Sequence, residues 1–164
     1  NPSVMYEWGA RLEGGQMSEM QRLRYQPEKT SLDIRPQVQK TGAKPSGLWY
    51  SVGDEWKQWC KAEDFRVSKL NVVYEIAVNK DAILFLTSEQ QIREFSVEFM
   101  LRSTPWQTWD IDWSRVAEQW AGIEIAPYQY GCRFDSDSRW YSGWDVASGC
   151  IWGPEALLGW KEIS

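Results

Sequence analysis

Residues 44–51 carry side chains that can bind a ligand, at spacings that bring them together. The stretch reads Lys-Pro-Ser-Gly-Leu-Trp-Tyr-Ser, and residues 48–50 are typical of a short strand that delivers two aromatic rings, Trp49 and Tyr50, next to the hydroxyl of Ser51. Ser51 and Asp54 have the spacing of a capping box, so we expect a helix to begin there. The unpartnered N–H groups of a helix start attract an anion or a polar ligand. The alternative is an ordinary strand-to-helix turn in the protein core.

Two carboxylates and one arginine lie in sequence contexts that could also do chemistry. Asp145 lies in residues 140–152, which are otherwise rich in aromatic and small residues, and Glu124 has apolar neighbours in residues 123–126. Arg35 ends a short alternating segment that a proline stops. Each has a plainer interpretation: Asp145 can cap a turn, Glu124 can lie on an edge strand facing solvent, and Arg35 can form a surface ion pair.

The rarer side chains narrow the possible chemistry. The chain has no histidine, which removes the usual general base, the usual metal-binding imidazole and any Ser-His or Cys-His dyad. Its three cysteines, Cys60, Cys132 and Cys150, have neither zinc-site spacing nor an even number. We therefore predict no metal, and buried thiols in a reducing compartment, although Cys132 and Cys150 could pair in an oxidising one.

Length and charge favour one acidic domain with a local binding groove. The 164 residues are enough for a real core, and the twelve tryptophans are far more than usual, so we expect most in the core and some in groove walls. The net charge is −5, but residues 1–50 carry +2, from seven Lys and Arg against five Asp and Glu. This acidity argues against broad binding of a nucleic-acid backbone, while leaving room for a local basic pocket.

The periodic segments that must position these residues predict an α+β fold. We expect strands at residues 72–78, 83–86 and 123–126, and a last strand closed by a proline, with a helical turn or loop at 155–158. One helix should begin at Ser88, which has Gln91 in capping-box spacing, and another should cover residues 113–120. Helices and strands do not alternate regularly enough for a doubly wound parallel sheet.

The start of the chain suggests an appendage, either a short amphipathic helix laid on the main domain or a partly ordered leader. Residues 1–30 have mixed composition, with Met17, Met20 and Leu23 at helical spacing, so we interpret them as an appendage to a domain at 31–164. The chain begins with Asn1 rather than methionine, which predicts a processed or excised C-terminal piece of a larger protein. No apolar run approaches the length of a membrane span, and we predict no membrane contact.

The order of motifs resembles the ADP-ribosyltransferase superfamily, in its poly-ADP-ribose-polymerase-like and bacterial toxin branches. The resemblance covers roughly residues 31–160 and rests on a strand ending in Arg35, the run Gly47-Leu48-Trp49-Tyr50-Ser51 before a helix, the strands at 72–86, the run Gly122-Ile123-Glu124-Ile125, and the late run Cys150-Ile151-Trp152-Gly153-Pro154-Glu155-Ala156-Leu157. It implies a split antiparallel β-sheet core with flanking short helices.

The resemblance also implies roles for particular residues. Tyr50 or Trp49 would stack on the nicotinamide of NAD, with Ser51 as the hydroxyl that often follows, and Arg35 would hold the ribose or phosphate. The late strand of the family begins with a catalytic glutamate, but this sequence has Ser148 and Gly149 there. Asp145 or Glu124 would then supply the carboxylate, and Asp145 is preferred because it is flanked by Trp144 and Ser148.

These roles predict a glycosyltransferase reaction: an NAD-dependent ADP-ribosyltransferase, acting as a toxin or effector domain, that transfers ADP-ribose to a macromolecular acceptor such as protein or RNA. A carboxylate near the ribose would stabilise an oxocarbenium-like state, and NAD would be a substrate with no metal needed. Such a domain would act in a reducing cytoplasm after secretion or delivery, and an inhibitory immunity protein is a further partner. The alternative is a non-enzymatic, Trp-rich protein-binding module or a toxin inhibitor.

Overall fold

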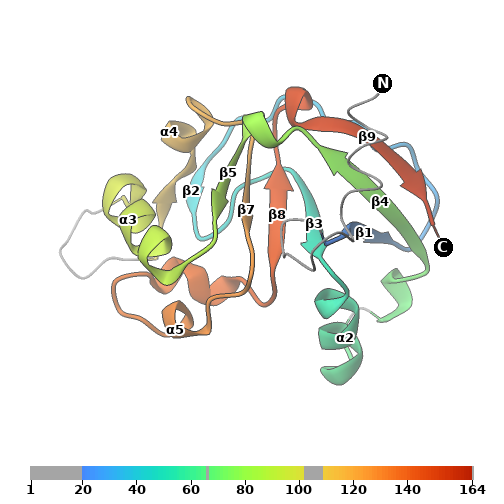
Figure 1. The fold of residues 1–164 in the computed structure, drawn as a ribbon, viewed down its shortest axis with the longest axis horizontal. Helices are drawn as coiled ribbons and strands as arrows, with labels where there is room; N and C mark the ends of the chain where they lie inside the picture. The colour runs from blue at the N-terminus through green and yellow to red at the C-terminus, as the bar shows by residue number, and fades with distance from the viewer. Residues whose placement is uncertain (1–19, 66, 102–108, 164) are drawn as a thin grey trace.

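The computed structural model of this chain describes residues 20–65, 67–101 and 109–163 (Figure 1). Its strands are β1 (Arg22–Gln26), β2 (Thr41–Gly42), β3 (Leu48–Val52), β4 (Val72–Val78), β5 (Ile83–Leu86), β6 (Ile111–Asp112), β7 (Gly122–Ile125), β8 (Ser148–Ile151) and β9 (Leu157–Glu162). Its α-helices are α2 (Glu55–Ala62), α3 (Glu89–Phe99), α4 (Trp113–Ala117) and α5 (Tyr130–Arg133). Short 3-10 turns are η2 (Val67–Lys69), η3 (Lys80–Ala82), η4 (Arg139–Gly143) and η5 (Pro154–Ala156).

Seven strands form one curled sheet in the order β5-β7-β8-β3-β1-β4-β9. Neighbouring strands are antiparallel except for β5 and β7, which run parallel. The strands turn progressively from β5 to β9, as Figure 1 shows, and β2 pairs with β6 in a separate ribbon. The described residues are thus α+β, as predicted, with an antiparallel-dominated sheet and few, short helices.

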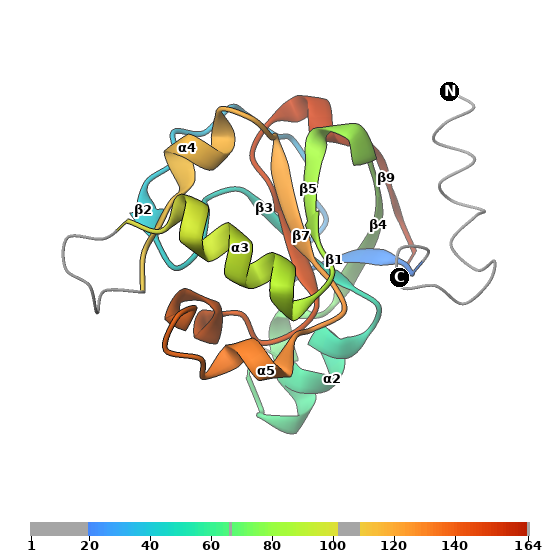
Figure 2. The same cartoon turned by 60° about the vertical axis from the view of Figure 1, so that its left-hand side comes forward.

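The main core lies between the sheet and the helices that cross β5 and β7 (Figure 2). Ile92, Phe95 and Phe99 of α3 are buried there, as the helical spacing predicts. Large indoles fill the same layer, and their N–H groups are satisfied: Trp140 donates to Ser96 Oγ at 2.8 Å and Trp113 to the Gly42 carbonyl at 3.0 Å. Trp113, Trp140, Trp144 and Trp152 are buried in the core, where an indole N–H needs such a partner, whereas the other described tryptophans are half-buried or exposed.

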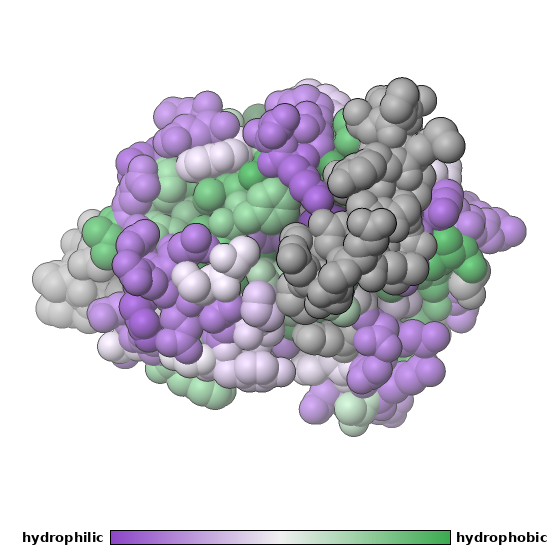
Figure 3. Space-filling model, in the orientation of Figure 1, coloured by the Kyte–Doolittle hydropathy of each residue, from purple (hydrophilic) through white to green (hydrophobic). Residues whose placement is uncertain are grey.

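A hydrophobic area lies at the edge of the sheet on the face shown in Figure 3, over the position of β5 in Figure 1. Leu84 and Phe85 of β5 are half-buried and pack against the core. β5 pairs with β7 on one side only, so this strand is an edge of the sheet. No helix in the described ranges is long and apolar enough to cross a membrane.

Several local predictions are confirmed. The strands at 72–78 and 83–86 have the predicted bounds, and the apolar part of residues 44–51 forms β3. Ser88 caps α3, since its side-chain oxygen accepts a hydrogen bond from the Gln91 backbone N–H. No disulfide joins Cys60, Cys132 and Cys150, and all three are buried.

Other expectations are wrong at the ends of the chain. Residues 22–26, expected in an appendage, form β1 between β3 and β4 in the sheet, so the domain includes residues before the expected boundary at residue 30. The predicted helical positions Met17 and earlier lie outside the described residues. The segment ending at Arg35 is not a strand. The helical turn or loop predicted at residues 155–158 is present in part as η5 (Pro154–Ala156), and the edge strand β9 begins at Leu157.

The predicted capping box at Ser51 is also wrong. β3 continues through Ser51 to Val52, and the Ser51 hydroxyl donates to the Leu23 carbonyl on β1 at 3.3 Å. α2 begins at residue 55, and the Asp54 side chain makes no capping bond. Ser51 is held in the sheet because β1, absent from the sequence prediction, supplies the neighbouring strand.

Candidate functional site

A cavity of about 680 Å³ opens where β1, β3 and the start of β8 meet α2. Its wall is formed by residues from five segments: Leu23, Arg24, Tyr25, Gln26, Pro27, Glu28 and Thr30 from β1 and its following turn; Lys44, Trp49, Tyr50 and Ser51; Trp56; Lys69 and Leu70; and Trp144, Asp145, Val146 and Ser148. Ligand sites are commonly concave surfaces of this size that combine apolar walls with a few polar groups. The cavity is therefore the candidate site in the described part of the chain.

Most of the residues predicted from sequence meet in this cavity. Trp49, Tyr50 and Ser51 line it from β3, and Asp145 and Ser148 line it from the segment that leads into β8. β3 and β8 are antiparallel neighbours, with Ser51 opposite Ser148, which explains how residues about a hundred positions apart share one wall. Arg35 is exposed in an irregular segment and does not line the cavity.

Behind Tyr50 lies a buried cluster of three polar side chains, Arg22, Tyr50 and Glu124. Arg22 Nε donates to Glu124 Oε1 at 2.6 Å and a terminal guanidinium nitrogen donates to Oε2 at 3.3 Å, while the Tyr50 hydroxyl donates to Oε1 at 2.8 Å. The three residues are only 5%, 3% and 2% exposed. Burial, together with the adjacent Glu124 charge, raises the pKa of Tyr50 well above its ordinary value. This geometry is a two-point ion pair with a phenol that stays protonated.

Gly149 of β8 makes room for that cluster. Glu124 and Tyr50 each lie opposite Gly149, from the strands on its two sides. A Cβ at Gly149 would stand 2.3 Å from the Tyr50 ring and hydroxyl, so the ring crosses β8 only because this position has no side chain. The resemblance places an acid at Ser148 or Gly149; in the structure the missing side chain at Gly149 lets the Tyr50 hydroxyl reach Glu124 across β8.

Arg24, two residues after Arg22, has a different environment. Its Nε donates to Gln26 Oε1 at 3.2 Å and its Nη1 donates to the Trp49 carbonyl at 3.0 Å, both of which are neutral acceptors. No carboxylate among the described residues forms an ion pair with it, although it is half-buried in the cavity wall. Burial lowers the pKa of Arg24, as expected for a cation that is desolvated without a counter-ion.

Aromatic rings flank this cation. Trp49 is half-buried, packs edge-on against Trp144 at 4.9 Å between ring centroids, and has the Lys44 ammonium 5.6 Å from its own centroid. Trp56 of α2 lines the other side. Flat faces beside cations suit a ligand that joins an aromatic ring to an anionic group. The positive charges come from Arg24, Lys44 and Lys69, not from the start of a helix at Ser51.

Asp145 faces the same cavity with its carboxylate partly exposed. One oxygen lies 3.6 Å from Nη2 of Arg133, and both side chains are about a quarter to a third exposed, at 26% and 30%. An ion pair of this length and exposure holds its partners weakly. The neighbouring Arg133 Nε is buried without a hydrogen-bond partner in the described residues. The Asp145 carboxylate is therefore available to a ligand.

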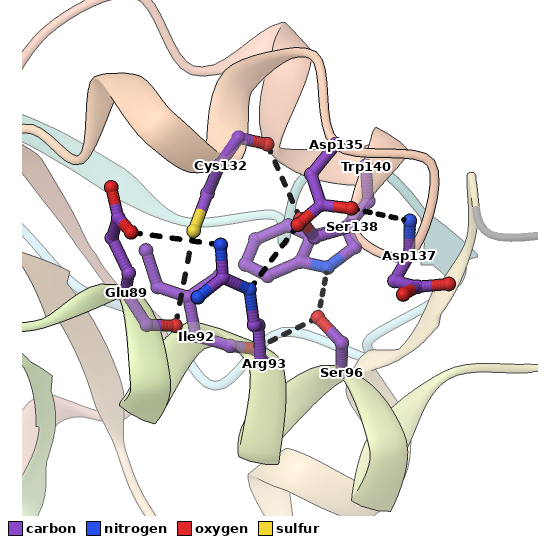
Figure 4. A network of polar contacts seen from close by, with 9 residues as sticks. All are labelled: Glu89, Ile92, Arg93, Ser96, Cys132, Asp135, Asp137, Ser138 and Trp140. Carbon is purple, nitrogen blue, oxygen red and sulfur yellow. Dashed lines mark hydrogen bonds and ion pairs between the residues drawn. The ribbon is translucent and has the colours of Figure 1, made fainter.

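The segment that carries Asp145 is fixed by contacts to α3. Arg93 of α3 forms ion pairs with Glu89 and Asp135, with nitrogen–oxygen distances of 3.6 Å and 3.2 Å. Figure 4 shows both contacts. Ser96 accepts the Trp140 indole N–H in the same network, and the Tyr128 hydroxyl donates to the Trp144 carbonyl next to Asp145. The network in Figure 4 is thus a structural support for the cavity wall and not a second site.

The sequence interpretation missed Arg22, Arg24 and the pairing of Glu124. The run Arg-Leu-Arg-Tyr-Gln alternates charged and apolar residues, which is the pattern of a strand. That signal was available, but the partner of Arg22 is 102 residues away. Among the described residues, no three acidic, cysteine or histidine side chains are grouped to hold a metal ion.

No protein-family model, no curated protein and no solved structure matches this chain.

Proposed function

We propose that this protein is an NAD-dependent ADP-ribosyltransferase whose NAD site is the Trp49 cavity, with the curled seven-stranded sheet corresponding to the split sheet of that superfamily. One observation carries the proposal: a single cavity combines the cation of Arg24, which has no described carboxylate partner, with the flat face of Trp49 and the accessible carboxylate of Asp145. These three groups match three adjoining parts of NAD, namely its diphosphate, its nicotinamide ring and the ribose between them.

Each residue has a role that follows from its surroundings. Arg24, in place of Arg35, binds the diphosphate through its planar set of donors. Trp49 stacks on nicotinamide, because its ring is half-buried, whereas Tyr50 is only 3% exposed and its hydroxyl is bound to Glu124. Ser51 and Ser148 line the wall between these groups and add hydroxyl dipoles.

The reaction breaks the bond between ribose C1′ and the nicotinamide nitrogen. The bonding electrons leave with nicotinamide, whose ring becomes neutral, and positive charge develops on the ribose. Asp145 stabilises that charge until a nucleophile of the acceptor bonds to C1′ and loses its proton. The carboxylate acts by electrostatics alone, so the mechanism needs no histidine and no metal.

Asp145 is assigned this role instead of Glu124 because of accessibility. The Glu124 side chain is 3% exposed, is paired with Arg22 and is absent from the cavity wall. It positions Tyr50, which forms part of the wall. Moving Glu124 to the ribose would break a buried ion pair, whereas Asp145 needs only to release a weak contact with Arg133.

The proposal includes the setting that the superfamily implies. The acceptor is a macromolecule, protein or RNA, and the domain acts as a toxin or effector in a reducing cytoplasm after delivery. An inhibitory immunity protein would then cover the cavity. Exposed Lys44 and Lys69 at the mouth of the cavity support contact with a partner there. The buried, unpaired cysteines support action in a reducing compartment, because they need no oxidising environment.

Nicotinamide release from NAD tests this function, with and without cell lysate as a source of acceptors. We expect release by the wild-type protein to increase with lysate, and Asp145→Asn to reduce it by about a hundredfold or more while NAD binding stays within about tenfold. Asp137→Asn, an exposed acid on the same loop, is the matched control. A folded protein that releases no nicotinamide and whose melting temperature is unchanged by NAD would overturn the proposal.

A second candidate function rests on the aromatic cluster of α2. Trp56 and Trp59 stack with ring centroids 5.3 Å apart, and Phe65 lies edge-on to both, with 39% of its surface exposed. α2 lies at the lower end of the molecule in Figure 1, directly after β3. Exposed aromatic clusters are common in protein interfaces, so this helix favours a protein-binding module.

The two candidates predict opposite effects of two substitutions. If the protein is a binding module, Phe65→Ser should abolish capture of a partner protein and Arg24→Gln should leave it unchanged. If it is a transferase, Arg24→Gln should weaken NAD binding and Phe65→Ser should leave nicotinamide release, measured without added acceptor, within about twofold. Measuring NAD binding and partner capture for both variants separates these functions.

A further inference from the structure

Gln26 stands out because it is a buried polar side chain whose hydrogen bonds all serve to orient Arg24. Its amide oxygen accepts from Arg24 Nε at 3.2 Å, while its amide nitrogen donates to the Glu28 carbonyl at 3.2 Å and to Thr30 Oγ1 at 2.8 Å. It is 8% exposed. Because these two bonds hold the amide nitrogen of Gln26, its amide oxygen is the end that faces Arg24 and accepts its N–H.

The turn that follows β1 is folded back to make this arrangement. The Thr30 backbone N–H donates to the Tyr74 hydroxyl on β4 at 3.0 Å, which anchors the residue that accepts from Gln26. Tyr74 lies opposite Arg24 in the β1–β4 ladder. A series of hydrogen bonds therefore links Arg24 to the sheet: Tyr74 holds Thr30, Thr30 holds the Gln26 amide, and Gln26 holds the guanidinium of Arg24.

A neutral acceptor has a different effect from a carboxylate at this position. Both can hold an arginine N–H, but a carboxylate also neutralises the cation and competes with any anionic ligand. Arg22 on the same strand has a carboxylate partner, Glu124, and is closed to ligands. Arg24 has only the Gln26 amide and the Trp49 carbonyl, so its orientation is fixed while its charge stays uncompensated by the described residues.

We propose that Gln26 is a positioning residue that holds Arg24 for the phosphate group of a ligand and, being neutral, keeps the arginine's charge for that phosphate. This inference rests on the proposed function for its ligand class, a nucleoside diphosphate linkage, and adds a residue on which the affinity depends. Gln26 touches Arg24 and not the reacting atoms, so it acts on binding and not on bond cleavage.

The decisive variant is Gln26→Glu, which places a carboxylate of nearly the same size beside Arg24 Nε. Binding of inorganic pyrophosphate to the full chain is measured by calorimetry at fixed ionic strength. We expect an affinity loss of about tenfold or more, the scale of one charge-assisted hydrogen bond. The control is Gln119→Glu, which adds the same charge at an exposed position outside the cavity, with affinity within about twofold of wild type.

A pH profile separates charge from a mere change of shape. The ratio of wild-type to Gln26→Glu affinity should fall towards one as the pH is lowered and the new carboxyl becomes protonated, because a neutral carboxyl resembles the amide. A purely structural defect would give a ratio that does not depend on pH. Where NAD is cleaved, Gln26→Glu should raise KM while leaving kcat within about threefold.

Thr30→Val supplies a second variant in case Gln26→Glu does not fold. Thr30 is exposed, and the substitution removes only the side-chain oxygen that orients the Gln26 amide. We expect pyrophosphate affinity to fall about threefold with the melting temperature nearly unchanged. Wild-type affinity in both folded variants, or no pyrophosphate binding by the wild-type protein, would overturn the inference.

The outcomes distinguish this inference from the proposed function. If Gln26→Glu releases nicotinamide with an unaltered KM, the transferase function would be supported and the positioning role of Gln26 would be overturned. Pyrophosphate binding that depends on Gln26, without nicotinamide release in any lysate, would keep the phosphate site and remove the transferase.

Discussion

Arg22 and Arg24 are two residues apart on β1, yet their surroundings differ in one decisive way. Arg22 meets the Glu124 carboxylate at 2.6 Å in a buried cluster, whereas Arg24 meets only neutral acceptors at the wall of a cavity. A buried cation with a carboxylate partner holds strands together, while an oriented cation without one attracts anions. The difference gives Arg22 a structural role and makes Arg24 the arginine that we propose to bind an anionic ligand.

The largest expected effect is on stability, from breaking the Arg22 pair. Glu124→Gln leaves the Arg22 cation buried without its counter-charge and should lower the free energy of unfolding by about 3–5 kcal/mol. Urea unfolding measures it. Glu118→Gln, at an exposed position, should change the free energy by no more than about 0.5 kcal/mol. Equal urea midpoints for Glu124→Gln and the wild type would show that the cluster is not structural.

Gly149→Ala should have the next largest effect, because it disturbs the same cluster through Tyr50. The new Cβ would lie 2.3 Å from the ring, so Tyr50 must leave Glu124, at a cost of about 1–3 kcal/mol. A double-mutant cycle with Tyr50→Leu tests the cause: the cost of Gly149→Ala should nearly vanish when the ring is absent. Additive costs in the cycle would place the strain elsewhere.

Unlike Glu124→Gln and Gly149→Ala, Arg24→Gln should have little effect on stability and a clear effect on ligand binding. We expect the free energy of unfolding to change by less than about 1 kcal/mol, since a desolvated cation is removed. Pyrophosphate affinity should fall by about tenfold or more. Titration calorimetry and urea unfolding on the same sample check both. A loss of stability like that of Glu124→Gln would remove the distinction between the two arginines.

The smallest effect is a pH dependence confined to the buried cluster. Burial raises the pKa of Tyr50 in the folded protein above the ordinary tyrosine value of 10.0. The stabilisation that the protonated Tyr50 contributes is therefore full below that ordinary value and is lost as the pH rises above it. Between about pH 8 and pH 11, Tyr50→Phe should therefore lose less stability than the wild type. Unfolding midpoints at the two pH values measure this difference. Identical pH dependence would show that Tyr50 does not titrate differently on folding.

Local patterns predicted those parts of the fold that local physics determines. Residues 72–78 combine β-branched and aromatic side chains, so β4 follows from propensity alone, and Ser88 caps α3 through atoms three residues away. β1 was missed because it buries an arginine, which is favourable only with Glu124 opposite. The error at Ser51 has the same origin, since its hydroxyl bonds to β1.

The candidate site was partly predictable for a related reason. Trp49 and Tyr50 were predicted from the short strand at residues 48–50, and Asp145 from its position between aromatic and small residues; the cavity contains all three. The cation was assigned to Arg35, because a local segment cannot reveal which arginine lacks a counter-ion. That property depends on every carboxylate nearby in space, so it emerges only from the folded chain.

The position of β8 in the sheet has a consequence for the order in which the protein assembles. β8 lies between β7 and β3, and thereby joins two groups of strands, β5-β7 and β3-β1-β4, that are made earlier in synthesis. Until residue 151 has left the ribosome, these groups share no ladder, and each exposes unpaired backbone along the future seam. Completion of the sheet thus awaits the synthesis of β8, and a chain stalled before residue 148 would present two open edges to chaperones or to other chains.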